Sequence, residues 1–370
     1  MLGTIGLILV ALLVLSILVV VHEFGHFLAA KLMGIWPEEF GIGLPPRVWG
    51  KKIGETLWSI NALPLGGFVR LHGETMEPHL NQPARSYVGK SKLARAFVAV
   101  AGVGMNVLFA ILAFSFIFFM LGIPNGISVS KVSEDSPAAG IGLSEGDTIL
   151  AIDGKSLYNP AFFGQNVASH AGKDIEITYK SGETGEIVDK KFVLRPLAPE
   201  GQGLLGVLYN PSPAGYLETP GISRFLVSIK YGAIETWDFT RLILTEFGKM
   251  FTGLFHGKVP TGLTGPLGVV GVTAEAASQG IYDLIGLSAL ISLNLALINL
   301  VPFPPLDGSR VLFLIIEGVV GRKRLPKYEE KIHTIGMYLL LILVALLTFR
   351  EIPKLLTAGS LSGFVDSLIK

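Results

Sequence analysis

The chain contains no cysteine among its 370 residues. Disulfides, thiolate metal sites and cysteine nucleophiles are therefore excluded, and any bound metal must be held by His, Asp, Glu or Asn. Charged residues are also scarce, at 16%, whereas hydrophobic residues make up 50% and the mean hydropathy is +0.56. A soluble globular protein rarely has this composition, but a membrane protein with a soluble insert does. The net charge of +1 gives no indication of nucleic-acid binding.

The N-terminal apolar run, residues 1–21, lacks the positive charges that open a secretory signal peptide, and no small-residue cleavage site follows it. We therefore expect a retained transmembrane helix. A membrane span needs about 20 apolar residues. The sequence predicts four such spans, at about residues 4–32, 93–121, 284–316 and 335–349, with prolines interrupting the third.

The last third of the first span carries His22, Glu23 and His26, an HExxH motif. On a helix the two histidines share one face and can coordinate a single Zn²⁺. Glu23 is then close enough to take a proton from a metal-bound water. Ionisable groups inside a membrane helix are costly to bury and usually mark function. The motif therefore predicts a zinc hydrolase.

Lysine and arginine gather in the connection between the first two spans and in the connection between the last two. Such loops remain in the cytoplasm, which predicts extracytoplasmic termini and an extracytoplasmic middle segment.

Residues 40–71 alternate aromatic and β-branched residues with glycine and proline, a pattern typical of short strands or hairpins. Such a sheet could dip into the membrane and present an edge to an extended substrate by strand addition. An ordinary interfacial loop is the alternative.

Residues 136–154 closely resemble the run of a PDZ domain in which a short helix leads to a strand and an Asp-Gly turn. Strand candidates at 128–132 and 174–179 flank it. A PDZ groove accepts a peptide as an added strand, so this domain would be either a steric filter or a ligand trap. A linker is expected over 199–220, amphipathic helices over 222–254, and a turn at 264–268.

A catalytic zinc site normally has three protein ligands, so a third is expected in another span. Asp307 is the only charged residue between Leu284 and Ser309, and it follows prolines that break the helix. The alternatives are a protonated Asp307 or an ion pair with Arg310.

Together, HExxH, the 299–308 sequence NLVPFPPLDG and a single PDZ run make the chain resemble the bacterial site-2 protease family, of the regulator-of-sigma-factor type. The resemblance implies His22, His26 and Asp307 as zinc ligands and Glu23 as general base. It also implies substrate contacts from a further set of residues: Asn299, Asn294, Gly66, Gly67 and Phe68. In two places the chain departs from the family pattern, with Val103 where the second span often has proline and Ser309 where a second glycine often follows Asp-Gly.

The expected fold is a polytopic α-helical membrane protein with four transmembrane helices, a membrane-associated β-loop and one extracytoplasmic PDZ (α+β) domain. The predicted parts are 1–33 (first span), 34–92 (β-loop and edge strand), 93–122 (second span), 123–198 (PDZ domain), 199–283 (linker and amphipathic helices), 284–318 (third span), 319–333 (cytoplasmic loop) and 334–370 (fourth span and tail).

The resemblance implies an intramembrane zinc metalloprotease of the bacterial plasma membrane, with its active site towards the cytoplasmic side. Its expected partners are the lipid bilayer and single-span membrane substrates, namely anti-sigma factors and signal-peptide remnants, with no nucleic acid. A metal transporter or sensor using the same His/His/Asp set, and a non-catalytic PDZ scaffold, are the alternatives. The remaining histidines, His72, His79, His170, His256 and His333, are expected at the surface.

Overall fold

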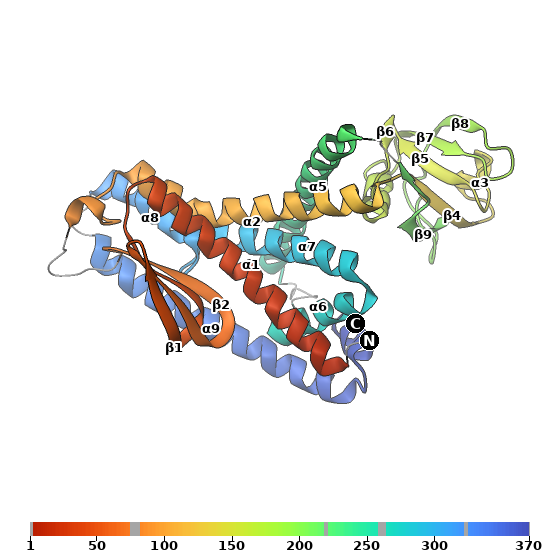
Figure 1. The fold of residues 1–370 in the computed structure, drawn as a ribbon. Helices are drawn as coiled ribbons and strands as arrows, with labels where there is room; N and C mark the ends of the chain where they lie inside the picture. The colour runs from red at the N-terminus through yellow and green to blue at the C-terminus, as the bar shows by residue number, and fades with distance from the viewer. Residues whose placement is uncertain (1–2, 75–81, 218–220, 258–263, 322–324, 370) are drawn as a thin grey trace. The chain divides into compact units, whose positions relative to one another are not determined.

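The structure is a computed structural model of the chain, and it describes residues 3–74, 82–217, 221–257, 264–321 and 325–369. The chain divides into two compact units. Unit 1 comprises Met1–Phe114 and Gly232–Lys370, and unit 2 comprises Ser115–Tyr231. Unit 1 is mostly helical with one small sheet, whereas unit 2 is built on a larger β-sheet (Figure 1). The sheet unit is thus an insertion between the two sequence halves of the helical one.

Four helices of the described chain are long and apolar enough to cross a membrane. They are α1 (Thr4–Leu32), α2 (Lys92–Leu121), α7 (Ile281–Leu300) and the Lys331–Thr357 part of α9 (Leu325–Thr357). At about 1.5 Å per residue, even the shortest is about 30 Å long, the thickness of the hydrocarbon core. Helices occur at all four predicted positions.

Helix α9 begins well before the expected fourth span. The loop predicted over 319–333 is therefore wrong at both ends: residues 319–320 belong to the preceding helix and residues 325–333 to α9, while residues 322–324 lie outside the described part. Good helix formers such as Lys and Glu follow Leu325, so the helix begins before the apolar stretch at about residues 335–349.

The third apolar region is two helices, because α7 ends at Leu300 and α8 (Asp307–Val320) starts after a break at 301–306. The three prolines in the break remove backbone donors and prevent a continuous helix. A Cβ on Gly308 would lie 2.2 Å from the carbonyl oxygen of Leu300, so only glycine lets α8 start this close to the end of α7. Asp307 consequently lies in the first turn of a helix.

The turn predicted at 264–268 is wrong, because α6 (Pro266–Gln279) begins there. Proline favours the first helical position, where its missing N–H needs no partner. Helix α6 buries small residues and packs against α1, α7, α9 and the C-terminal helix α10 (Leu361–Ile369). The predicted amphipathic region forms one helix, α5 (Ile222–Phe255), which is not among the four membrane-crossing candidates.

The predicted strands at 40–71 are present as β1 (Pro37–Ile53) and β2 (Thr56–Leu71), joined by a turn with Gly54 at φ +62°. Register shifts divide both strands, so that Phe40 pairs with Trp58 on one side and with Val69 on the other. Residues 67–71 therefore form an outer edge of this sheet, with no second partner strand in the described residues.

Unit 2 contains a sheet with strand order β8-β7-β5-β4-β9. Its apolar core includes Ile149, Ile175 and Ile177, all fully buried. The strands are β4 (Ile127–Val132), β5 (Thr148–Ile152), β7 (Asp174–Lys180), β8 (Ile187–Val193) and β9 (Val207–Pro213), with β6 (Lys155–Ser156) beside β5. The smaller elements are β3 (Ile123–Pro124), paired with β10 (Tyr216–Leu217), and the short helices α3 (Pro137–Gly140) and α4 (Phe163–Ala168).

Strand β9 corrects the linker predicted over 199–220. Residues 207–213 pair with β4, and Val207 and Tyr209 pack against the core of unit 2. The glycines and prolines around them suggested a linker. Burial of the alternating apolar side chains against the core of unit 2 is favourable, however, and an exposed linker would not bury them. The predicted strands at 128–132 and 174–179 are present as β4 and β7.

Candidate metal centre and active site

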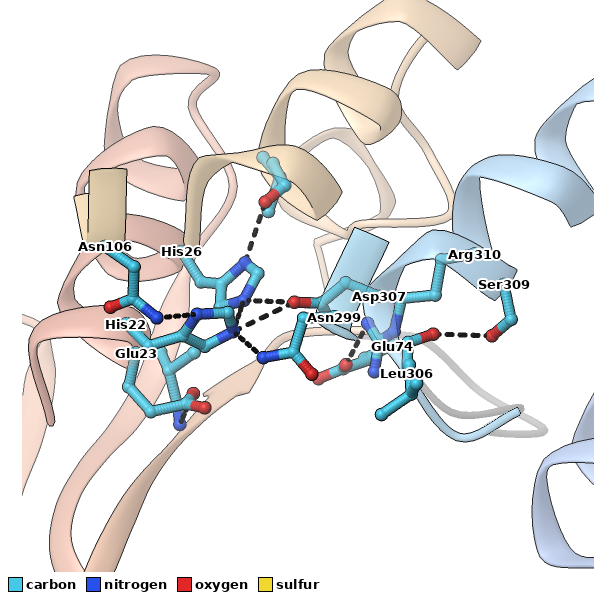
Figure 2. Close-up of polar contacts among 12 residues, drawn as sticks. His22, Glu23, His26, Glu74, Asn106, Asn299, Leu306, Asp307, Ser309 and Arg310 are labelled. Atoms are coloured by element: carbon cyan, nitrogen blue, oxygen red, sulfur yellow. Dashed lines mark hydrogen bonds and ion pairs between the residues drawn. The ribbon is translucent and has the colours of Figure 1, made fainter. Parts of the chain in front are cut away.

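His22, His26 and Asp307 come together in unit 1, although Asp307 lies 281 residues after His26 in the chain. His22 Nε2 lies 2.9 Å and His26 Nε2 lies 3.1 Å from the same oxygen, Asp307 Oδ2. The two Nε2 atoms are 3.2 Å apart. Figure 2 shows the imidazoles of α1 and the carboxylate of α8 pointing toward one another. The three residues predicted as metal ligands thus present three donor atoms to one point.

This donor set fits a zinc ion. Zinc bonds His nitrogen and carboxylate oxygen at about 2.0–2.2 Å in a tetrahedron, which places neighbouring donors about 3.3–3.6 Å apart. The observed separations of 2.9–3.2 Å need only a small expansion to reach that geometry. Both histidines are buried, and Asp307 exposes 18% of its side chain. Three protein ligands also leave a fourth position open, as catalytic zinc sites require.

Helix α2 holds the two histidine rings from behind. His26 Nδ1 donates to the backbone carbonyl of Val98 at 2.8 Å, and the Asn106 amide lies 3.2 Å from His22 Nδ1. Between them, a Cβ on Gly102 would lie 2.4 Å from His26 Nε2 and 2.7 Å from His22 Nε2. Gly102 is therefore the residue that allows α2 to approach the rings this closely.

Glu23 lies between the two histidines in sequence and is half-buried. Its Oε2 accepts a hydrogen bond of 3.1 Å from the backbone N–H of Val69, at the outer edge of the hairpin sheet. A carboxylate in this position is oriented by a fixed donor rather than left free to rotate. The edge strand and the HExxH helix are linked directly through this bond.

The two predicted asparagines differ in placement. Asn299 Nδ2 lies 3.4 Å from His22 Nε2, on the side of the ring that faces Asp307. Asn294 instead donates from Nδ2 to the carbonyl of Leu290 in its own helix, at 3.0 Å. Asn299 is thus beside the three donor atoms, whereas the hydrogen bond of Asn294 stays within α7.

Gly66, Gly67 and Phe68 lie where the hairpin returns to α1. A Cβ on Gly67 would lie 2.8 Å from the carbonyl oxygen of Gly41 and 3.2 Å from a methyl of Val20. Gly66 has φ +77°, which favours glycine, and it faces Val19. These contacts place the start of the edge strand one helical turn before His22.

Charged residues surround this centre without pairing to its carboxylate. Arg310 Nη1 lies 2.5 Å from Glu74 Oε1, so the ion pair with Asp307 that the sequence left open is replaced by one with Glu74 (Figure 2). A second ion pair, which is buried, joins Arg95 to Glu317 at 2.7 Å. Nearby, burial raises the pKa of the Tyr87 hydroxyl and keeps it neutral.

One histidine was wrongly predicted to be a surface residue. His72 exposes only 3% of its surface and bonds Glu38 at 2.7 Å. A histidine outside any motif gives no sign in the sequence that a tertiary carboxylate will accompany it. His79 lies outside the described residues.

The sequence analysis assigned no role to four groups of the site: the Val69 N–H, the Val98 carbonyl, Gly102 and Asn106. Two of these are backbone groups, which no side-chain pattern can reveal. The other two carried a signal, since Gly102 and Asn106 stand one turn apart on the same face of the second span.

The Peptidase family M50 model matches residues 10–343 of this chain. The chain belongs to peptidase family M50. This is the site-2 protease family, whose members are zinc-dependent and whose known role is intramembrane proteolysis. With the four apolar helices, membership indicates a bacterial membrane protein that acts on membrane-protein substrates.

Individual relatives cover nearly the whole chain. A Clostridium perfringens protein, provisionally named a zinc metalloprotease, is 35% identical over 93% of this chain and 98% of its own length. The zinc metalloprotease RasP of Geobacillus kaustophilus is 28% identical over 96% of this chain and 99% of its own. Among solved structures, the PDZ domain of an SdrC-like protein from Listeria innocua is 34% identical over 23% of this chain and 93% of that structure, with a TM-score of 0.20.

Proposed function

We propose that this M50 peptidase binds zinc through His22, His26 and Asp307 and uses Glu23 to cleave peptide bonds within transmembrane segments. The observation that carries this proposal is the convergence of those three donor atoms within 3.2 Å of one another, with both histidines on α1, a helix apolar enough to span a membrane. Hydrolysis of a peptide bond inside the membrane requires a water molecule and a general base at the same site. The half-buried Glu23 can be that base, because it adjoins His22 in the sequence.

Zinc held by the three ligands would polarise the scissile carbonyl and lower the pKa of water, making it a nucleophile near neutral pH. Glu23 accepts a proton from the attacking water and delivers it to the amide nitrogen as the C–N bond breaks. The hydrogen bond from Val69 N–H supports this role, because it fixes where the carboxylate stands. A non-catalytic scaffold has no chemical need for an oriented carboxylate beside the three donor atoms.

Substrate binding is assigned to the edge strand and to Asn299. A transmembrane helix satisfies its own backbone, so it must unwind before a carbonyl becomes accessible. Residues Gly66, Gly67 and Phe68 lead into the free edge, which accepts the unwound segment by strand addition. Asn299 donates from its amide to the oxygen of the scissile carbonyl, where negative charge develops. The contacts of Asn294 support a role in α7 itself rather than at the substrate.

We propose that the active site faces the cytoplasm, with the termini and unit 2 outside; the lysine and arginine residues in the two short connections support this orientation. The substrates are single-span proteins of the anti-sigma-factor kind and signal-peptide remnants, by analogy with the family. Unit 2 then serves as a filter that excludes substrates with bulky extracytoplasmic domains.

Glu23→Gln tests the mechanism. The variant should bind zinc with the stoichiometry of the wild type, while cleavage of a single-span substrate falls by about 10²–10⁴-fold, the usual contribution of a general base. Glu55→Gln is a matched control, because Glu55 is exposed and pairs with Arg85 instead. Metal analysis of the purified protein and a gel-based cleavage assay are the measurements. Wild-type cleavage by Glu23→Gln would refute the assigned mechanism.

A further inference from the structure

Asn106 is fully buried within the second span and belongs to none of the roles assigned above. Its Nδ2 is placed 3.2 Å from His22 Nδ1, and its Oδ1 has no hydrogen-bond partner in the described residues. Its backbone carbonyl accepts a hydrogen bond of 3.0 Å from the Ser292 hydroxyl of α7, which fixes α2 against α7 at this level. The Asn106 amide is therefore held close to His22, while its oxygen has no hydrogen-bond partner in the described residues.

The two histidines can be compared directly. His26 has its Nδ1 beside the Val98 carbonyl, which can only accept, so Nδ1 carries the proton and Nε2 keeps a free lone pair. For His22 to offer Nε2 in the same way, its Nδ1 must also donate. That requires the Asn106 amide to present Oδ1, and the oxygen and nitrogen of an amide exchange places by a simple rotation of the group.

We infer that Asn106 is a positioning residue that accepts a hydrogen bond from His22 Nδ1 through Oδ1 and so fixes the His22 tautomer that binds metal. This inference rests on the proposed function, because it concerns the same zinc site. Val98, Gly102 and Asn106, spaced four residues apart on α2, form one stripe facing the HExxH turn. Its ends orient one imidazole each, and its middle leaves room for both rings.

The stripe also explains why a helix without any metal ligand lies against the site. A histidine ligand almost always donates its second ring N–H to a carbonyl, carboxylate or similar acceptor, and loss of that acceptor typically costs 10- to 100-fold in metal affinity. Val98 supplies a backbone carbonyl, which substitution cannot remove. Asn106 supplies a side chain, so its contribution can be measured.

The experiment compares Asn106→Leu, of similar size without an acceptor, with Asn106→Asp, which keeps one. Zn²⁺ affinity is measured on the detergent-purified full chain by competition with a chromophoric chelator. We expect Asn106→Leu to lose about 10- to 100-fold in affinity and Asn106→Asp to stay close to the wild type. Absorption spectra of the Co²⁺-loaded proteins should differ from the wild type for Leu and not for Asp.

Ser288→Ala is the control, since Ser288 is buried in α7 and its hydroxyl donates to the Leu284 carbonyl of its own helix. Its Zn²⁺ affinity should not change. If Asn106→Leu does not fold, Asn106→Val replaces it in the same comparison. The inference is overturned if the apolar variant binds Zn²⁺ as tightly as the wild type, or if the apolar and Asp variants lose affinity equally. In either case the proposed function stands as long as the wild-type protein binds zinc and cleaves its substrate. A wild-type chain that binds no zinc overturns both.

Discussion

Gly102 shows how a single missing side chain permits the site. It lies on α2 opposite both imidazoles, and a methyl group there would occupy the space of His26 Nε2 and His22 Nε2. Gly25, on the other side of the same crossing, would place a Cβ 2.4 Å from the Ala101 carbonyl oxygen. Close approach of α1 and α2 therefore depends on glycine from both helices.

Gly102→Ala should abolish or strongly reduce zinc binding, because the added methyl group must displace the two histidine rings or separate α2 from α1. Cleavage activity should be lost with the metal. Isothermal titration with Zn²⁺ and metal analysis after purification are the measurements.

Gly104→Ala is the matched control, since it lies two residues further on the same helix and a Cβ there meets nothing within 4 Å. It should bind zinc normally and be slightly more stable, because alanine favours helix over glycine by about 0.5–1 kcal/mol. Equal zinc binding by both alanine variants would contradict the account of Gly102.

At the scale of elements, α6 depends on a carboxylate that belongs to another helix. Glu351 of α9 is buried and accepts hydrogen bonds from the N–H groups of Gly265 and Gly268, at 2.7 and 3.2 Å. The first N–H groups of a helix have no partner within it, and negative charge is favourable there. Phe364 of α10 packs against Gly271 on the same helix. Helix α6 is thus held by residues from the C-terminal part of the chain.

Glu351→Gln should lower the free energy of unfolding by about 1.5–3 kcal/mol, because a charged acceptor of two buried N–H groups becomes a neutral one. The thermal midpoint in detergent is the measurement. Glu246→Gln is the control, since Glu246 is exposed and pairs with Lys249 in the same helix. A Glu351→Gln midpoint as high as that of the control would show that this interaction does not hold α6.

For the whole molecule, the division into two units predicts separate responses to damage. Unit 2 has its own apolar core, with strands that pair among themselves. The three proposed metal ligands all lie in unit 1. Loss of core packing in unit 2 should therefore leave the zinc site intact.

Ile177→Ala should destabilise unit 2 by about 2–5 kcal/mol, because it removes a fully buried side chain and leaves a cavity. Zinc content should equal that of the wild type. Hydrogen exchange followed by mass spectrometry should show faster exchange in β5 and β7 and no change in α1. Ile187→Ala on the neighbouring strand is the control, because Ile187 is 65% exposed; faster exchange in α1 of Ile177→Ala would contradict the division.

The local sequence determined most of the elements and the chemistry of the site. Long apolar runs predicted α1, α2, α7 and α9, because backbone polar groups in a membrane must be satisfied within a helix. The HExxH spacing predicted two ligands on one helical face, and the scarcity of charge in the third apolar region left Asp307 as the third. Alternating residues predicted the hairpin and the main strands of unit 2.

Tertiary structure alone decided which groups complete the site. The Val69 N–H reaches Glu23 because the hairpin turns back onto α1, and His72 is buried because Glu38 approaches it in three dimensions. Helix α6 and strand β9 were misread as turn and linker, since proline and glycine punctuate both kinds of segment and only packing distinguishes them. The sequence alone determines residue types and their spacing, whereas long-range backbone contacts depend on how the helices and strands pack together.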